Sequence, residues 1–220
     1  MRNVVVLGAS GHAKVVIDIL NCQAGFNVVG CVAQDSPAIE SVLGLPVLGE
    51  DKDLPLLIRK HHIQAVVLAI GDNYRRSQLL AKIGDELEGI EFVSALHPSA
   101  VIAKDVKIGE GTVVMAGAVV NPGCDIGRFC IVNSKASLDH DSTMEDFSSL
   151  APGVTTGGNC YLEQFAAVNI GAVLSQGLRV GRHSVIGAGS VLLTSVSSHV
   201  VAYGTPATVI RKRKEGDNYW

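Results

Sequence analysis

The 220-residue sequence has few aromatic residues, few charged residues and no long apolar run. Charged residues make up 18% of the chain and hydrophobic residues 47%, a balance that excludes an intrinsically disordered protein. The net charge of −3 provides no basic field for nucleic acid. Because no run of 18 or more apolar residues occurs, we predict no membrane span. Aromatic residues at 5% beside 24 glycines indicate repetitive β-packing.

The five cysteines form no CxxC motif, and their odd number argues against a disulfide framework. A reducing compartment is the simplest interpretation, so we expect a cytoplasmic protein. The N-terminus has no small-residue cleavage site before its glycine-rich turn. We therefore interpret it as a first strand rather than a signal peptide.

Residues 1–95 alternate between apolar runs typical of buried strands and segments with helical spacing. The runs predict strands at 4–7, 28–33, 65–70 and 91–93, and the spacing predicts helices at 13–20, 51–62 and 74–87. Loops are expected around Pro37 and at 44–46. This alternation predicts a Rossmann-like parallel sheet.

Ligands of such sheets bind beyond the carboxyl ends of the strands, where loops 8–12, 33–35 and 71–76 are expected. Gly8 and Gly11 would let the backbone approach a phosphate at the following helix N-terminus. The G-x-x-G spacing lacks the full dinucleotide fingerprint, so it favours a nucleotide over NAD specifically. A tight strand-to-helix turn with no ligand is the alternative.

The rest of the chain has a period of six residues. From Ile102 to Leu192, fifteen of sixteen positions in this register are aliphatic or Met, and Thr156 is the exception. Small residues recur four positions later. The pattern resembles the left-handed parallel β-helix of hexapeptide acyltransferases, in which three hexapeptides form one triangular coil. We assign residues 96–205 to this β-helix and residues 206–220 to a basic tail.

Three cysteines occupy the small-residue position of the repeat, namely Cys124, Cys130 and Cys160. The register points their side chains inward as small hydrophobes, which argues against a cysteine nucleophile.

His140 lies off both inward ladders, between Asp139 and Asp141. Neighbouring carboxylates favour the imidazolium and so raise the basicity of histidine, as a general base requires. An exposed polar residue on the wall of the β-helix is the alternative. Eighteen residues later, one coil above, Gly158 leaves the space over the imidazole clear and offers a backbone N–H as an oxyanion donor.

A metal site like that of the β-helical zinc carbonic anhydrases would need three histidines around one ion. His140 and His183 are more than two coils apart, and His199 lies beyond the last full coil, so we expect no metal. The basic run 211–214 is either a solvated tail or a contact for coenzyme A phosphates.

The whole chain resembles the sugar-nucleotide N-acetyltransferases of bacillosamine and perosamine type, which are related to sialic acid O-acetyltransferases. The resemblance rests on G-A-S-G-H-A-K-V-V at 8–16, I-G-D-N-x-x-R at 70–76, H-P-S-A at 97–100, the His140–acid pair and G-T-P-A at 204–207. Three positions depart from the family pattern: the short acid Asp141, Ser149 in place of a second histidine, and Thr208 after the G-T-P-A motif.

The resemblance implies a role for each matching residue. The nucleotide-sugar, with UDP favoured over GDP and dTDP, would be held by Gly11, His12, Asp35, Asn73 and Arg76. His140, supported by Asp141, would take the proton of the C4 amine of a 4-amino-4,6-dideoxysugar as that amine attacks acetyl-CoA directly, with Gly158 at the oxyanion. Acetyl-CoA, as co-substrate, would lie against Ser149, Gly158, Ile170, Ala188 and Arg211.

Members of this family are homotrimers with acetyl-CoA between adjacent β-helices, and the reaction serves bacterial surface glycan synthesis. In the trimer, the base would act on sugar held by the neighbouring chain. Two other functions remain open on the sequence: O-acetylation of a sugar of the sialic acid type, and a non-catalytic scaffold that binds nucleotide-sugars.

Overall fold

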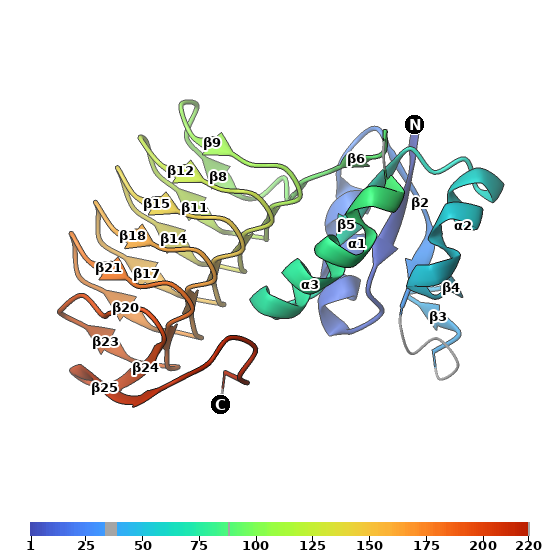
Figure 1. Cartoon of the computed structure of the whole chain (residues 1–220). Coiled ribbons are helices and arrows are strands. Elements are labelled where there is room, and N and C mark those ends of the chain that lie inside the picture. Colours follow the sequence, from blue (N-terminus) through green and yellow to red (C-terminus); the bar gives the residue numbers. More distant parts are fainter. Residues whose placement is uncertain (34–38, 88, 220) are drawn as a thin grey trace. The chain divides into compact units, whose positions relative to one another are not determined.

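The computed structural model describes residues 1–33, 39–87 and 89–219. The chain divides into two compact units, Met1–Pro98 and Ser99–Trp220. Figure 1 shows the first as a sheet with helices and the second as a stack of coils. Within the described residues, no helix has the length and apolar character needed to cross a bilayer.

The N-terminal unit is built on a six-stranded sheet with the strand order β3-β4-β2-β1-β5-β6. Its strands are β1 (Arg2–Leu7), β2 (Phe26–Val32), β3 (Ser41–Val42), β4 (Leu45–Gly49), β5 (Ala65–Leu68) and β6 (Glu91–Phe92), and β7 (Ala95–Leu96) follows. Its helices are α1 (Gly11–Cys22), α2 (Leu54–Lys60) and α3 (Asn73–Ile83), with 3-10 turns η2 (Asp51–Asp53) and η3 (Gly84–Leu87).

β1 and β5 form the centre of this sheet, and their side chains from Val4 to Leu7 and from Ala65 to Leu68 are at most 1% exposed. They pair in parallel, with Val4 opposite Ala65. From β1 the chain proceeds outward through β2 and β4, and then returns to β5 on the other side of β1. The strand order therefore reverses between β1 and β5, which is where such sheets bind ligands.

The predicted Rossmann-like sheet is confirmed, but residues 44–46 are not simply the expected loop. β3 and β4 form an antiparallel hairpin around Leu43 and Gly44, whose φ values are 49° and 78°. β4 then extends the parallel sheet by pairing with β2. Pro46 and the short apolar stretch around it concealed two strands: β4, which contains this proline, and the two-residue edge strand β3 beside it.

The second unit is a parallel β-helix with two-residue strands on three faces. The β8 sheet contains β8 (Val101–Ile102), β11 (Val119–Val120), β14 (Ser137–Leu138), β17 (Thr155–Thr156), β20 (Val173–Leu174) and β23 (Val191–Leu192). The β9 sheet contains β9 (Lys107–Ile108), β12 (Asp125–Ile126), β15 (Thr143–Met144), β18 (Tyr161–Leu162) and β21 (Arg179–Val180). The β10 sheet includes β10 (Val113–Val114), β13 (Ile131–Val132), β16 (Ser149–Leu150), β19 (Ala167–Val168), β22 (Val185–Ile186), β24 (Val200–Gly204) and β25 (Ala207–Lys212).

Each coil is 18 residues long, so Val113 pairs with Ile131 and Ile131 with Ser149. The second residue of each two-residue strand points inward, and from Val114 to Leu192 these residues are at most 4% exposed. Cys124, Cys130 and Cys160 are also buried, as their register predicts. The six-residue period of the sequence thus corresponds to the spacing of the side chains that form the core of the β-helix.

Another position of the repeat, three residues after each inward aliphatic, adopts left-handed backbone. It has positive φ at every step from Gly111 to Gly189, including Phe129, Asp141, Phe147 and His183. At one corner, aromatic rings in this position stack in a column, with centroids 5.3 Å apart between Phe129 and Phe147. Glycine avoids the cost of this conformation, whereas each aromatic residue offsets it by stacking.

The C-terminal residues are not a free tail. Residues 207–212 form β25, which pairs antiparallel with β24. Arg213 is 6% exposed and donates from Nη1 to the carbonyl of His183 at 2.9 Å. Three of the four residues of the basic run 211–214 are therefore built into the last layer of the β-helix.

Candidate active site

A cavity of about 630 Å³ opens at the carboxyl ends of β1 and β5. It is lined by residues 8–10 after β1 and residues 69–72 after β5, together with Arg75 and Lys82 of α3. Gly8 is required there, because a Cβ atom would lie 2.6 Å from the carbonyl oxygen of Ala69. The two loops approach each other closely where the strand order reverses.

The two helices that begin at this cavity have different N-termini. Asp72 caps α3, and its carboxylate accepts the Arg75 N–H at 2.8 Å. Ser10 precedes α1 without such a side-chain cap, and the first turn of α1 has no acidic residue. The positive end of the α1 dipole is therefore left available to an anion, as the glycine-rich loop predicts.

Of the residues expected at the nucleotide, the four that the structure describes are all absent from the cavity lining, and two of them are buried. Arg76 is 1% exposed and donates to the carbonyl of Ile70 at 2.7 Å and to the Asn73 side chain at 2.8 Å. Asn73 is equally buried. These two residues hold the loop after β5 in shape, while His12 is half-buried.

Burial and the nearby Arg76 guanidinium lower the pKa of His12 to about 4, so its ring is neutral at pH 7. Its buried Nε2 has no hydrogen-bond partner within the described structure. Gly11 is exposed at the start of α1, and a Cβ atom there would meet nothing within 4 Å. Asp35 lies outside the described residues.

Sequence reasoning missed a pair of charged residues on the cavity wall. Asp51 is 4% exposed, and its Oδ2 lies 3.2 Å from Lys82 Nζ. The sequence carries no signal for this pair, because the two residues are on separate elements and belong to no motif.

In the β-helix, His140 and Asp141 form a hydrogen-bonded pair. Nδ1 of His140 lies 2.8 Å from Oδ2 of Asp141. An ionised carboxylate can only accept, so Nδ1 carries the proton and Nε2 presents its lone pair. Asp141 reaches the ring although it is short, because it occupies the left-handed position with φ of 56°.

The pKa of His140 is raised above its usual value, chiefly by the hydrogen bond to Asp141. The charge of Asp139 acts in the same direction. Asp139 also accepts the backbone N–H of His140 at 2.8 Å and the Asn121 side-chain amide at 2.6 Å. These bonds lower the pKa of Asp139, which keeps it ionised.

Gly158 lies directly against the exposed nitrogen of this histidine. A Cβ atom at Gly158 would be 2.5 Å from both Nε2 and Cε1 of His140. Within the described residues, the Gly158 N–H donates no hydrogen bond, while its carbonyl accepts from Gly177 at 2.9 Å. The 18-residue register therefore brings the imidazole and an unused backbone donor together.

Thr156, the exception in the aliphatic ladder, contributes to this arrangement. Its hydroxyl accepts the backbone N–H of Asp139 at 3.0 Å, and the residue is 4% exposed. The polar side chain thus satisfies a donor one residue away from His140. The hexapeptide pattern marks Thr156 as an exception but gives no sign of this role.

A groove of about 690 Å³ lies on another corner of the β-helix. Three of the residues expected at acetyl-CoA line it together: Ile170, Ala188 and Arg211. Tyr203 and Tyr219 line it as well. The other two expected residues are elsewhere: Ser149 is half-buried on β16, and Gly158 lies beside His140.

The buried cysteines offer no alternative chemistry. Burial raises the pKa of the Cys160 and Cys124 thiols, which disfavours the nucleophilic thiolate.

Comparisons with known proteins agree with both units. Residues 3–83 match the PglD N-terminal domain family, and residues 105–140 match the bacterial transferase hexapeptide repeat. Over 96% of this chain and 98% of the other, the structure resembles PerB from Caulobacter crescentus in complex with CoA and GDP-perosamine, with a TM-score of 0.89 and 36% identity. The acetyltransferase domain of PglB from Neisseria gonorrhoeae is 30% identical over 96% of this chain and all of that domain, with a TM-score of 0.87.

Among curated proteins, the GDP-perosamine N-acetyltransferase of Escherichia coli O157:H7 is 28% identical over 84% of this chain and 82% of its own length. The fold and the site thus define an acyltransferase built on a Rossmann-like domain and a left-handed β-helix. The chain belongs to the sugar-nucleotide N-acetyltransferases of perosamine and bacillosamine type. It is an enzyme that uses acetyl-CoA as co-substrate, which excludes the non-catalytic scaffold.

Proposed function

We propose that the protein transfers the acetyl group of acetyl-CoA to the C4 amine of a nucleotide-linked 4-amino-4,6-dideoxysugar, with His140 as general base. The observation that carries this proposal is the His140–Asp141 pair facing Gly158. The alternative, acetylation of a sugar hydroxyl, would use the same base and is separated by the substrate panel below.

The reaction follows from this geometry in two steps. The amine is mostly ammonium at neutral pH, so His140 Nε2 takes one proton and frees the nitrogen lone pair to attack the thioester carbonyl. A C–N bond forms, and the carbonyl oxygen becomes an oxyanion that accepts the Gly158 N–H. Collapse breaks the C–S bond. The departing thiolate of CoA receives the second proton, which the acylated nitrogen gives up as the amide forms. The sugar amide is released, and the His140 imidazolium returns the first proton to solvent.

The groove is the proposed site for acetyl-CoA. Ile170 and Ala188 provide apolar walls, and the exposed guanidinium of Arg211 can pair with a phosphate. Tyr203 and Tyr219 offer aromatic faces for the adenine. CoA and acetyl-CoA are bound in the solved relatives PerB and PglB, which supports this use of the β-helix.

The cavity of the N-terminal unit is the proposed nucleotide site, with phosphates at the uncapped start of α1. Two observations favour a GDP-linked sugar over the UDP-linked sugar favoured by the sequence analysis. PerB and the E. coli relative, which are similar over most of this chain, are described with GDP-perosamine. In addition, the two carboxylate oxygens of Asp51 can accept the N1–H and N2–H of guanine together, whereas uracil has one N–H donor.

The two halves of the proposed catalytic site lie on different corners of one β-helix. His140 and Gly158 are on the corner after the β8 sheet, whereas Ile170 and Ala188 are on the corner before it. We propose that a neighbouring chain of a homotrimer supplies the missing half. The outward residues of the intervening β8 sheet support this, because all are uncharged: Val101, Val119, Ser137, Thr155, Val173 and Val191.

The neighbouring β9 sheet provides the contrast. Its outward residues include Lys107, Asp125 and Arg179. Val101 and Val173 of the β8 sheet are 64% and 42% exposed in the single chain. A protein interface is depleted of charge at its centre, so the β8 sheet fits a subunit contact better than the β9 sheet.

The test is a panel of GDP-, UDP- and dTDP-linked 4-amino-4,6-dideoxysugars, with the corresponding 4-hydroxy sugars as controls, assayed for CoA release. We expect the highest kcat/KM for a GDP-linked amine, and a reduced preference for GDP in Asp51→Asn. Turnover of hydroxy sugars but not of amines would overturn the N-acetyltransferase assignment. A preference for UDP-linked sugars that persists in Asp51→Asn would overturn only the assignment of guanine as the nucleobase.

A further inference from the structure

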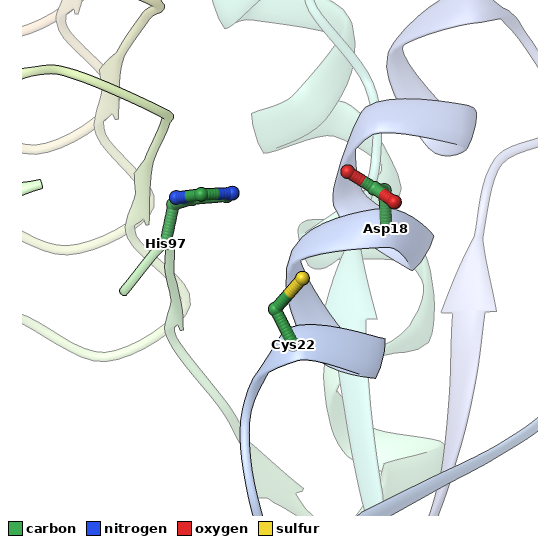
Figure 2. Close-up of side chains that lie close together, drawn as sticks. All are labelled: Asp18, Cys22 and His97. Atoms are coloured by element: carbon green, nitrogen blue, oxygen red, sulfur yellow. The ribbon is translucent and has the colours of Figure 1, made fainter. Parts of the chain in front are cut away.

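Three potential metal ligands meet in the N-terminal unit, away from the nucleotide cavity. Asp18 and Cys22 lie on α1, and His97 follows β7. Their ligand atoms, one from each side chain, all lie within 4.8 Å of one another. Figure 2 shows the ring of His97 directed toward α1, on the side of the helix where Asp18 and Cys22 lie. In the part of the chain that the structure describes, no other three His, Cys, Asp or Glu residues converge in this way.

The fold itself places these side chains together. Asp18 and Cys22 are four residues apart, so they lie one above the other on the same face of the helix. The chain near His97 is held against α1, because the Leu96 N–H donates to Oε1 of Gln23 at 3.2 Å. Ala95, in β7, is fully buried. The positions of the three ligands are therefore set by the packing of α1 and β7.

The set of donor atoms selects the class of ion. A thiolate with an imidazole favours Zn²⁺ over Mg²⁺ and Ca²⁺, which prefer oxygen ligands. Tetrahedral zinc with bonds of about 2.0–2.3 Å places its ligand atoms roughly 3.3–3.8 Å apart. Side-chain rotations that move the ligand atoms by about 1 Å would therefore close the site. Asp18 and Cys22 are exposed and His97 is half-buried, which leaves an entry path and room for water as fourth ligand.

We propose that Asp18, Cys22 and His97 bind one Zn²⁺ ion per chain, which clamps α1 to the end of the N-terminal unit. This site is separate from the acetyl transfer. Its histidine, His97, precedes the hexapeptide repeat, so it is not one of the histidines for which the repeat excludes a shared zinc ion. The ion would stabilise this unit by binding only the folded form, because His97 lies far from Asp18 and Cys22 in the sequence and meets them only after folding.

The experiment uses the full-length protein, stripped with a chelator and titrated with Zn²⁺ by calorimetry, with Mg²⁺ as comparator. We expect one Zn²⁺ per chain, a higher Tm with Zn²⁺, and no effect of Mg²⁺. Co²⁺ serves as a spectroscopic probe, and a thiolate-to-cobalt charge-transfer band would report a bond to sulfur. Cys22 is the exposed cysteine and the other four are buried, so this band would identify Cys22.

The variants Asp18→Asn, Cys22→Ser and His97→Gln should each weaken Zn²⁺ binding by more than the roughly 10–100-fold that loss of a supporting hydrogen bond costs. His61→Gln, a histidine outside the cluster, is the matched control and should bind normally. If His97→Gln does not fold, the two helix variants decide, because both replace exposed side chains. Absence of stoichiometric binding, or unchanged affinity and an unchanged cobalt spectrum in Cys22→Ser, would overturn the proposal.

Discussion

Gly158 lies so close to His140 that a Cβ atom on the glycine would be 2.5 Å from the Nε2 atom of the imidazole. Its backbone φ is not in the left-handed region, so the absence of a side chain is required by space rather than by backbone conformation. The glycine thus leaves open the approach to the nitrogen that presents its lone pair.

The first prediction concerns this contact. Gly158→Ala keeps the backbone N–H but should displace the imidazole and obstruct the thioester, lowering kcat by about 10²–10³, an effect as large as loss of one oxyanion donor. Gly158→Val should abolish most of the remaining turnover. Calorimetric binding of the nucleotide-sugar, which we assign to the N-terminal unit, should persist in both variants.

The control for this prediction is Gly84→Ala, where the new Cβ meets nothing within 4 Å. It should retain wild-type turnover. Normal kcat in Gly158→Ala would contradict the proposed role, as would combined loss of sugar binding, turnover and Tm, which would make Gly158 a structural residue.

The second prediction is a pH dependence. The hydrogen bond from His140 to Asp141 raises the pKa of the imidazole, and only the neutral imidazole can accept a proton. The value of kcat/KM should therefore fall as the pH drops below this raised pKa. Asp141→Asn removes the cause, so the acidic limb of the profile should move to lower pH while the maximum rate decreases.

Asp125→Asn, on the outward face of the β9 sheet, is the control for the pH profile and should leave it unchanged. His140→Ala should lower kcat by about 10²–10⁴ and remove the limb. An acidic limb that stays in place in Asp141→Asn would show that another group titrates.

The third prediction follows from the stacked aromatic column. Phe147 is 7% exposed, its ring lies 5.3 Å from those of Phe129 and Phe165, and its φ is 61°. Phe147→Ala should cost about 3–5 kcal/mol of stability. Phe147→Gly should cost about 1–2 kcal/mol less than this, because glycine adopts left-handed backbone without strain.

The check is the order of the two midpoints in thermal or denaturant unfolding. At Val132, a buried ladder position without positive φ, the alanine variant should be the more stable of the two. The same order at Phe147 as at Val132 would contradict the role we give to the backbone conformation.

These examples show which features the sequence could predict. The inward ladder was readable because burial imposes an aliphatic residue at every sixth position from Ile102 onward. The left-handed position was not, because its residues share a φ angle rather than a chemical property, and they range from Gly111 to Phe147. For the same reason, the sequence could place Asp141 beside His140 but could not show that the carboxylate reaches the ring.

In the N-terminal unit, motifs indicated the loops but not the orientation of their side chains. Asn73 and Arg76 belong to a recognisable segment, yet their side chains are buried behind the loop that they shape. Asp51 and Lys82 line the cavity without belonging to any motif. Burial of a charged side chain depends on packing between elements distant in the sequence, which local patterns do not report.

The last prediction tests whether one catalytic site is shared by two chains. His140→Ala removes the proposed base, and Ala188→Trp should fill the groove on the other corner of the β-helix. Each variant alone should be inactive. If the base of one chain serves the groove of its neighbour, any trimer that contains both variants has one site with an intact base and an intact groove.

Random assembly from equal amounts of the two chains makes three quarters of the trimers mixed, each with one intact site of three. Co-expressed variants should therefore recover roughly one quarter of wild-type activity. Separately purified variants that are mixed without subunit exchange provide the control and should stay inactive. A site built within a single chain predicts no recovery in either sample, because every chain then lacks its base or its groove. Light scattering on the co-expressed sample must give the mass of three chains. A wild-type protein that is fully active as a monomer would contradict the shared site.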